Sequence, residues 1–238
     1  MSAGLERACL IVVPTFNEAA NIATLVRALR AVTPAHVLVV DDNSPDGTGN
    51  LAEAISRSDP RVHVLRRPAK LGIGKAYVAG FRWGLERGYQ RFFEMDADLS
   101  HEPRYLPLLN DALDHGADVV IGSRSVEGGA IEGWGPLRYL LSKGGSLYAR
   151  TLLGVSVRDM TSGFKGYTRA ALRAIDVETL TTNGYAFQIE TTYRAIRRGL
   201  RVEEVPIVFV DRRAGRSKMG RGDVIEAVTT VLALRRHR

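Results

Sequence analysis

Short runs of apolar, mostly β-branched residues constrain this chain more than any other sequence feature. The run 10–13 ends at Pro14, and the run 37–40 ends at two consecutive aspartates. Such runs are typical of strands buried on both faces, and their alternation with segments of helical spacing is typical of a mostly parallel, doubly wound sheet. The sequence therefore predicts an α/β fold in which helices flank both faces of the sheet.

The expected elements can be placed along the chain from this pattern. Strands are expected at 10–13, 37–40, 62–65, 91–95, 119–122, 165–168 and 202–210. Helices are expected after Asn17 and near Thr48, at 74–86, at 103–114, at 137–153 with an interruption at Gly144-Gly145, at 186–198, and after Asp223. No linker separates two domains, so we expect one catalytic domain over 1–222, with 223–238 as an amphipathic, basic C-terminal extension of it.

Charge and cysteine content narrow the class of protein. The 238 residues carry a formal net charge of +7, which suits nucleic acid, anionic lipid or phosphorylated small molecules. Cys9 is the single cysteine, so no disulfide framework can form. The start of the chain contains Glu6 and Arg7 and lacks the apolar core of a signal peptide. The single cysteine favours a reducing compartment such as the cytoplasm. No stretch reaches the roughly 18 apolar residues that span a bilayer, so we expect a protein that meets any membrane from its surface.

Charged side chains gather where the predicted strands end. They are Glu18, Asp41, Asp42, Asp96, Asp98 and Arg124. In open α/β sheets, ligands bind beyond the carboxyl ends of the strands. The sequence therefore places the functional site at that edge of the sheet.

Asp96 and Asp98 form the first candidate cluster. Two carboxylates two residues apart can both turn toward one hard cation and leave most of its coordination sphere to water and phosphate oxygens, as Mg²⁺ prefers and Mn²⁺ accepts. The pattern is common on surfaces, but here it follows Phe92-Phe93-Glu94-Met95, the end of an expected strand, and so falls in a strand-end loop. The pair Asp41-Asp42 ends another strand. These two acids either cap a turn or hydrogen-bond a nucleobase or ribose.

Three known glycine-containing motifs are incomplete or absent in this chain. The segment 72–76 resembles part of a P-loop, but Ala69 and Ala76 stand where glycine and serine or threonine are needed. Gly122-Ser123-Arg124 is not a nucleophile elbow, which needs the pattern Gly-x-Ser-x-Gly. No Gly-x-Gly-x-x-Gly follows the first strand, which argues against a dinucleotide-dependent dehydrogenase.

Six segments occur in an order that resembles one enzyme family. They are 11–18 (IVVPTFNE), 40–48 (VDDNSPDGT), 96–101 (DADLSH), 122–124 (GSR), 159–165 (DMTSGFK) and 211–219 (DRRAGRSKM). The chain resembles the polyprenol-phosphate mannosyltransferases, or dolichol-phosphate mannose synthases, of the inverting GT-A glycosyltransferase family 2. The resemblance covers about residues 8–222, and the ordered set is more specific than any single segment.

The resemblance implies roles for individual residues. The nucleotide-sugar site would contain Pro14, Phe16, Glu18, Asp42 and Ala97, with Arg212 and Lys218 closing over the diphosphate. Asp96 and Asp98 would bind Mg²⁺ or Mn²⁺, while Arg124 and Arg138 would receive the lipid phosphate. Ser100 is a third candidate ligand, at a position where the family often has glutamine. Its shorter side chain would reach the metal only through water or a shifted backbone.

The implied substrates are GDP-mannose and a polyprenyl phosphate. A phosphate monoester has a second pKa of about 6 and is mostly a dianion at neutral pH, so it needs little help from a general base. This fits the scattered histidines, of which His101 lies nearest the proposed metal and is interpreted as stabilising its loop.

The acceptor implies a membrane surface as the place of action. The amphipathic segment 134–153 and the basic end of the last helix are two ways to reach it, and either face could instead belong to the core. A separate membrane-anchoring subunit or domain would serve the same end. We therefore expect a peripheral protein on the cytoplasmic face of a membrane.

Three alternatives stay open at this stage. The same mechanism could use a different donor such as UDP-glucose. The basic charge could belong to a nucleic-acid-binding module, but no nucleic-acid-binding motif or aromatic-interleaved basic stripe is present, so we expect no nucleic-acid partner. An inactive scaffold is disfavoured because both metal carboxylates and both diphosphate-binding cations are present.

Overall fold

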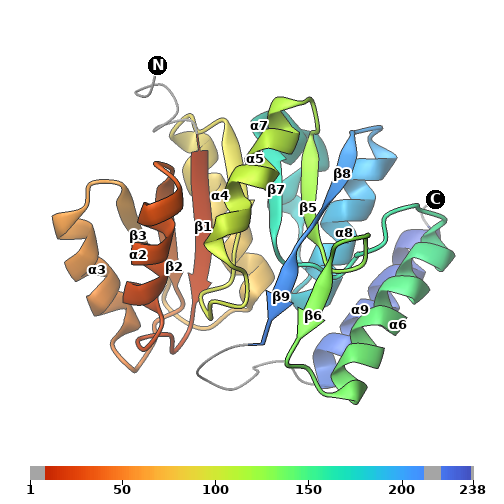
Figure 1. Cartoon of the computed structure of the whole chain (residues 1–238), viewed down its shortest axis with the longest axis horizontal. Coiled ribbons are helices and arrows are strands. Elements are labelled where there is room, and N and C mark those ends of the chain that lie inside the picture. The colour runs from red at the N-terminus through yellow and green to blue at the C-terminus, as the bar shows by residue number, and fades with distance from the viewer. Residues whose placement is uncertain (1–8, 212–220, 237–238) are drawn as a thin grey trace.

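The computed structural model describes residues 9–211 and 221–236, and its centre is a seven-stranded sheet (Figure 1). In spatial order the strands are β3 (Val62–Arg66), β2 (His36–Asp41), β1 (Cys9–Thr15), β4 (Arg91–Glu94), β7 (Lys165–Thr168), β5 (Val119–Ser123) and β8 (Val202–Pro206). Only β7 runs antiparallel to its two neighbours, and the other pairs in this sheet are parallel. The prediction of a mostly parallel, doubly wound sheet is confirmed.

Helices cover both faces of this sheet because alternate residues of each buried strand point to opposite sides. One face is covered by α2 (Ile22–Val32), α3 (Thr48–Ser58) and α5 (Leu106–Asp114), the last preceded by the 3₁₀ turn Pro103–Tyr105. The other face is covered by α4 (Ile73–Glu86), α7 (Arg169–Ile175) and α8 (Gly184–Arg197).

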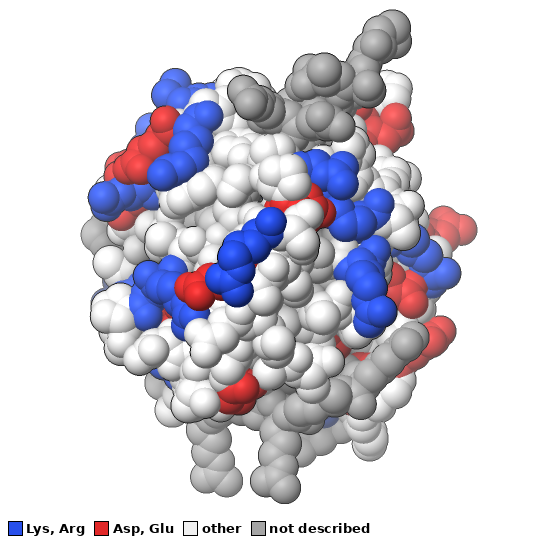
Figure 2. All heavy atoms as spheres, turned by 90° about the vertical axis from the view of Figure 1, so that its left-hand side faces the viewer, with Lys and Arg blue, Asp and Glu red and all other residues white. Residues whose placement is uncertain are grey.

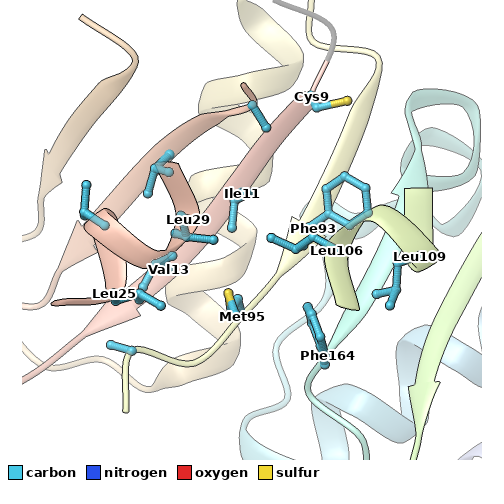
Figure 3. Close-up of a cluster of buried hydrophobic side chains, with 14 of the residues drawn as sticks. Cys9, Ile11, Val13, Leu25, Leu29, Phe93, Met95, Leu106, Leu109 and Phe164 are labelled. Atoms are coloured by element: carbon cyan, nitrogen blue, oxygen red, sulfur yellow. The ribbon is translucent and has the colours of Figure 1, made fainter. Parts of the chain in front are cut away.

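Strand β1 illustrates how the sequence separates the two layers. Ile11 and Val13 point into the cluster drawn in Figure 3, which also contains side chains of α2 and α5 such as Leu25 and Leu109. Leu10 and its alternate neighbours belong to the opposite cluster, against α4. Both sets are almost completely buried, which explains why the run shows no alternation of polar and apolar residues.

A smaller unit extends beyond the carboxyl ends of the strands. It contains the two-stranded parallel sheet of β6 (Ala130–Glu132) and β9 (Val208–Val210), and the helices α6 (Pro136–Leu153) and α9 (Arg221–Arg236). α6 and α9 lie side by side at the end of the molecule opposite α3 (Figure 1). α9 packs against α8 as well as α6. None of the described helices is long and apolar enough to cross a bilayer.

Three expectations about individual elements were wrong. The helix expected to break at Gly144-Gly145 is continuous, because buried residues such as Ala149 and Leu153 hold it and outweigh a cost of about 1 kcal/mol per glycine. The single strand expected at 202–210 divides at Pro206, which has no N–H to extend the ladder, and the next strand pairs with β6 instead. Strand β6 was not expected, and α9 begins at Arg221, two residues before the expected cap at Asp223.

Candidate active site

A cavity of about 310 Å³ opens beyond the carboxyl ends of β1, β2 and β4. It brings together ten of the twelve site residues expected from the sequence: Pro14, Phe16, Glu18, Asp42, Asp96, Ala97, Asp98, Ser100, Arg124 and Arg138. The other two, Arg212 and Lys218, lie outside the described residues. The first of these residues and the last are 124 positions apart, so the shared cavity is a property of the fold rather than of a local motif.

The first wall of the cavity is the loop after β1, which the turn after β2 holds in place. Ser44 Oγ accepts a hydrogen bond from the Asn17 backbone N–H at 3.0 Å, and Thr48 Oγ1 accepts one from Glu18 N–H at 2.8 Å. Asp46 Oδ2 accepts from Ala19 N–H at 3.0 Å. These contacts explain why the segments 11–18 and 40–48 occur together: the second positions the first.

The two aspartates after β2 have different environments. Asp41 is fully buried and accepts hydrogen bonds from Thr15 Oγ1 and Ser44 Oγ at 3.1 and 2.6 Å, so it organises the turn. Asp42 lines the cavity, pairs with Arg67 Nη1 at 2.8 Å and accepts from Leu71 N–H at 3.2 Å. Burial raises the pKa of Asp42 although Arg67 opposes the shift. Of the two, only Asp42 is available to a ligand in the cavity.

The Asp96-Ala97-Asp98 loop follows β4 and is fixed by its own neighbours. Asp98 Oδ1 accepts from Ser100 N–H at 3.1 Å and from Ser100 Oγ at 2.5 Å. His101 is buried, stacks on Phe164 and accepts from the Asp96 N–H through Nδ1 at 3.2 Å. Burial lowers the pKa of His101 to about 4, so the ring is neutral and can accept this bond at neutral pH. His101 thus stabilises the loop, as expected.

The donor set of this loop fits a hard divalent cation with an open coordination sphere. Asp96 and Asp98 both line the cavity, and about a third of the Asp96 side chain is exposed. Carboxylate oxygens are ligands of Mg²⁺ and Mn²⁺, and a site with two of them leaves positions for phosphate oxygens. Among residues 9–211 and 221–236, no three His, Cys, Asp or Glu side chains converge as a closed metal cage. Ser100 contacts the Asp98 carboxylate and acts on the loop through it.

Arg124 forms the opposite wall and is held by a buried ion pair. Its Nε and Nη2 donate to the two carboxylate oxygens of Asp159 at 2.8 and 2.7 Å, and its backbone N–H donates to the same group at 2.9 Å. Nη2 also donates to Thr161 Oγ1 at 3.0 Å. Burial acts to lower the pKa of Arg124, but the charge and hydrogen bonds of Asp159 outweigh it and raise the pKa. The guanidinium is therefore permanently charged and fixed in position at the cavity.

Arg138 lies beside this wall at the start of α6. Its guanidinium sits 4.1 Å from the centroid of the Trp134 ring, and its Nη1 donates to Asp211 Oδ1 at 2.7 Å. Trp134 also faces Arg124, whose guanidinium carbon is 5.6 Å from its ring centroid. Both guanidinium groups therefore lie against the same indole in the cavity wall.

Sequence reasoning missed the part of the wall that α8 contributes. Gln188 lines the cavity and donates through Nε2 to the buried carboxylate of Glu94 at 2.8 Å, while its Oε1 has no partner among the described residues. Lys165 Nζ donates to the backbone carbonyl of Gln188 at 2.7 Å. The signal that could have found this network is Glu94 and Lys165, two charged residues inside runs that predict fully buried strands. Asn183 and Tyr185 also line the cavity from this side.

Comparison with solved structures identifies the fold class. A glucosyl-3-phosphoglycerate synthase from Mycobacterium tuberculosis, in complex with Mn²⁺, UDP-glucose and phosphoglyceric acid, matches with a TM-score of 0.70. The match covers 96% of this chain and 80% of that chain at 20% sequence identity, a level that establishes the fold alone. The chain has the GT-A fold of glycosyltransferases.

Sequence comparison then identifies the family. The model described as "Glycosyl transferase family 2" matches residues 10–176, and the chain belongs to this family. An undecaprenyl-phosphate mannosyltransferase from Micrococcus luteus is 51% identical over 223 residues, covering 93% of this chain and 91% of its own length. A polyprenol monophosphomannose synthase from Mycolicibacterium smegmatis is 49% identical, covering 93% and 84%. The expectations of a GT-A fold, a family 2 protein and a glycosyltransferase are confirmed.

Proposed function

We propose that this enzyme transfers mannose from GDP-mannose to a polyprenyl phosphate, with inversion at the anomeric carbon and with a divalent cation. The observation that carries the proposal is that one cavity joins the Asp96 and Asp98 carboxylates to the fixed Arg124 guanidinium. The names of the two relatives at about half identity support mannose as the sugar and a polyprenyl phosphate as the acceptor.

The nucleotide would lie along the first wall of the cavity. Pro14, Phe16 and Glu18 provide this surface, and Asp42 offers a carboxylate to the base or ribose of the guanosine. Lys70 Nζ lies 4.7 Å from the centroid of the Phe16 ring and adds a positive charge at this end. Ala97, between the two aspartates in sequence, also lines the cavity. Arg212 and Lys218 keep their expected role of closing over the diphosphate.

Asp96 and Asp98 would hold Mg²⁺ or Mn²⁺ against the diphosphate. When bound there, such a cation would neutralise the charge that develops on the departing GDP. Its use is supported by the Mn²⁺ present with UDP-glucose in the glucosyl-3-phosphoglycerate synthase of the same fold. Ser100 and His101 keep the two carboxylates in place through the contacts described above.

Arg124 and Arg138 would bind the phosphate of the acceptor. A phosphate oxygen attacks the anomeric carbon of mannose from the side opposite the diphosphate, and the bond from that carbon to the β-phosphate oxygen breaks, releasing GDP. The dianionic phosphate is itself the nucleophile and needs no proton removed. Fixed guanidinium groups orient it and cost no reorganisation during the reaction, which is the role that the Asp159 pair gives to Arg124.

The sugar would face the wall formed by α8. Gln188 Oε1 and Asn183 Oδ1 are buried acceptors without a partner among the described residues, and both belong to residues that line the cavity. A buried acceptor without a donor costs about 1–3 kcal/mol. Mannose hydroxyl groups would supply the missing donors.

The acceptor requires the enzyme to work at a membrane, and we propose the cytoplasmic face, with α6 against the surface. Tyr139, Leu140, Leu141 and Leu147 of this helix are each about half or more exposed. A membrane-anchoring partner subunit or domain would add to this attachment. α9 packs on both α6 and α8, which supports a single catalytic domain over 1–222 with 223–238 as part of it.

A thermal-shift screen tests the choice of donor. Purified protein with Mn²⁺ is heated with GDP, GDP-mannose, UDP and UDP-glucose in parallel, and ligand at 100 times its Kd stabilises the fold by about 2.7 kcal/mol. We expect the guanosine compounds to raise the melting temperature and the uridine compounds to leave it unchanged. The reverse order would favour a polyprenyl-phosphate glucosyltransferase.

A further inference from the structure

A second cavity lies on the surface behind Arg124 and shares no lining residue with the first. Its volume is about 390 Å³, and its lining is Ser125, Lys143, Ser146, Leu147, Arg150 and Arg158. Three of these six side chains are cationic and none is acidic. No substrate or activity proposed above uses this cavity.

The three cations have no acidic side chain within ion-pair distance among the described residues. Lys143 Nζ donates to the backbone carbonyl of Arg124 at 2.8 Å and to Ser125 Oγ at 2.9 Å, both neutral acceptors. Two carboxylates lie nearby. Asp159 is bound to Arg124, and Glu204 accepts from the backbone N–H groups of Arg158 and Asp159. The cavity is therefore a concentration of positive charge.

This arrangement differs from the charged surface at the other end of the molecule. On the face shown in Figure 2, basic and acidic side chains lie next to each other. The pairs at that end include Arg66 with Glu53 at 2.8 Å and Arg61 with Asp59 at 3.4 Å. Like charges held close together repel, and partial burial and the nearby Arg124 charge lower the pKa of Lys143 although Asp159 opposes the shift. An anion in the second cavity would relieve both effects.

The position of the cavity on α6 indicates where the anion comes from. Residues 140, 143, 147 and 150 follow one another at spacings of three and four, so they lie along one face of the helix. This face alternates the exposed Leu140 and Leu147 with Lys143 and Arg150. On the neighbouring helix α9, Ile225 and Leu232 are also exposed. Apolar side chains interleaved with cations match the acyl and phosphate layers of a bilayer surface.

We propose that the second cavity binds the phosphate of an anionic phospholipid, so that the enzyme selects negatively charged membrane and docks α6 on it. The inference rests on the proposed function only in placing the enzyme at a membrane. The bound lipid is distinct from the acceptor, whose phosphate would meet Arg124 and Arg138 in the first cavity.

Vesicle co-sedimentation of the full chain tests this proposal. The vesicles are phosphatidylcholine alone, or phosphatidylcholine with phosphatidylglycerol, at one fixed salt concentration. Each basic side chain near an anionic surface contributes about a fivefold gain in partitioning, so Arg150→Gln with Arg158→Gln should lower it about 30-fold. The matched control is Arg57→Gln with Arg173→Gln, which removes the same charge from exposed positions on α3 and α7. We expect that control to stay within about twofold of the wild type.

The double substitution Arg150→Lys with Arg158→Lys keeps the charge and should restore binding, which separates loss of charge from misfolding. Equal losses in the cavity and control variants, or equal binding to neutral and anionic vesicles, would overturn the proposal. The proposal would also be overturned if inorganic phosphate raised the melting temperature of the wild type but not of the Gln variant, because the cavity would then bind a free anion.

Mannose transfer to a short-chain polyprenyl phosphate in detergent is measured on the same proteins. The Gln variant should keep the wild-type rate there, because neither residue belongs to the catalytic cavity. Absence of transfer by the wild type would refute the proposed function. The vesicle assay would still test the binding of anionic phospholipid, because it does not depend on transfer.

Discussion

Replacing Asp159 with asparagine removes the negative charge that holds Arg124 and keeps the shape of the side chain. Both partners are almost fully buried, at 1% and 5% exposure of their side chains. Breaking a buried ion pair by removing one partner costs about 3–5 kcal/mol, because the other charge is left without compensation. We therefore expect the free energy of unfolding of Asp159→Asn to fall by about that amount, and transfer to fall at least 100-fold as the guanidinium loses its fixed position.

Urea denaturation of the wild type and the variant, with the slope m compared, measures the first effect. The matched control is Glu86→Gln, which breaks the exposed pairs of Glu86 with Arg82 at 3.1 Å and with Arg87 at 3.7 Å and should cost less than about 1 kcal/mol. The double variant Arg124→Leu with Asp159→Leu should be more stable than Asp159→Asn, because it leaves no buried charge. A cost below about 1 kcal/mol for Asp159→Asn, with transfer unchanged, would refute the assignment of this pair as the anchor of the acceptor site.

Three further predictions concern packing, pH and the sugar wall. Gly74→Ala should lower the free energy of unfolding by about 1–3 kcal/mol, because the added Cβ would lie 2.2 Å from the Thr182 carbonyl oxygen. At Gly144 an added Cβ meets nothing within 4 Å, so Gly144→Ala should raise the free energy of unfolding by about 0.5–1 kcal/mol. Burial lowers the pKa of Lys165 from 10.5 to about 8, so between these pH values Lys165 is protonated in the unfolded chain and mostly neutral in the folded one. The free energy of unfolding of the wild type should therefore rise with pH over this range, compared with that of Lys165→Met. Gln188→Leu should reduce kcat for mannose transfer at least tenfold while GDP binding stays within about twofold, because in the proposed arrangement this cavity-lining side chain would meet the sugar and not the nucleotide.

Each of these has an outcome that would contradict it. Equal free energies of unfolding for Gly74→Ala and Gly144→Ala, measured by urea denaturation, would mean that the backbone near Thr182 can move aside. Parallel pH profiles for the wild type and Lys165→Met would mean that the Lys165 pKa is ordinary in the folded state. An equal loss of GDP affinity and kcat in Gln188→Leu would mean that Gln188 contacts the nucleotide or only stabilises the fold, and that it does not act on the sugar.

The sequence predicted the sheet because short apolar runs such as 37–40, rich in β-branched residues and ended by turn residues, are typical of strands buried on both faces. It did not predict where the chain leaves that sheet at Pro206, because the pairing of β9 with β6 depends on a partner more than 70 residues away. Nor did it predict the continuity of α6, since local propensity at Gly144-Gly145 is outweighed by packing.

The candidate site, too, contains residues that the sequence predicted and residues that it could not predict. Strand-end position was enough to propose Asp96, Asp98 and Arg124, since parallel strands bring their carboxyl ends to one edge. It could not separate Asp41 from Asp42, because adjacent residues share every local signal and only the turn around Ser44 decides which one faces the cavity. Gln188 was missed because its role depends on contact with Glu94, 94 residues earlier in the chain.

The central claim is that the Asp96 and Asp98 carboxylates support metal-dependent transfer of mannose to a lipid phosphate. The most direct test incubates purified protein with labelled GDP-mannose, a polyprenyl phosphate and Mg²⁺ or Mn²⁺, and measures label in the chloroform-extractable product. We predict label in the lipid fraction, lost with a chelator and restored by excess cation, and absent in an Asp98→Ala variant whose melting temperature shows that it is folded. Label that persists through both the chelator and Asp98→Ala, or no lipid product from GDP-mannose at all, would contradict the account.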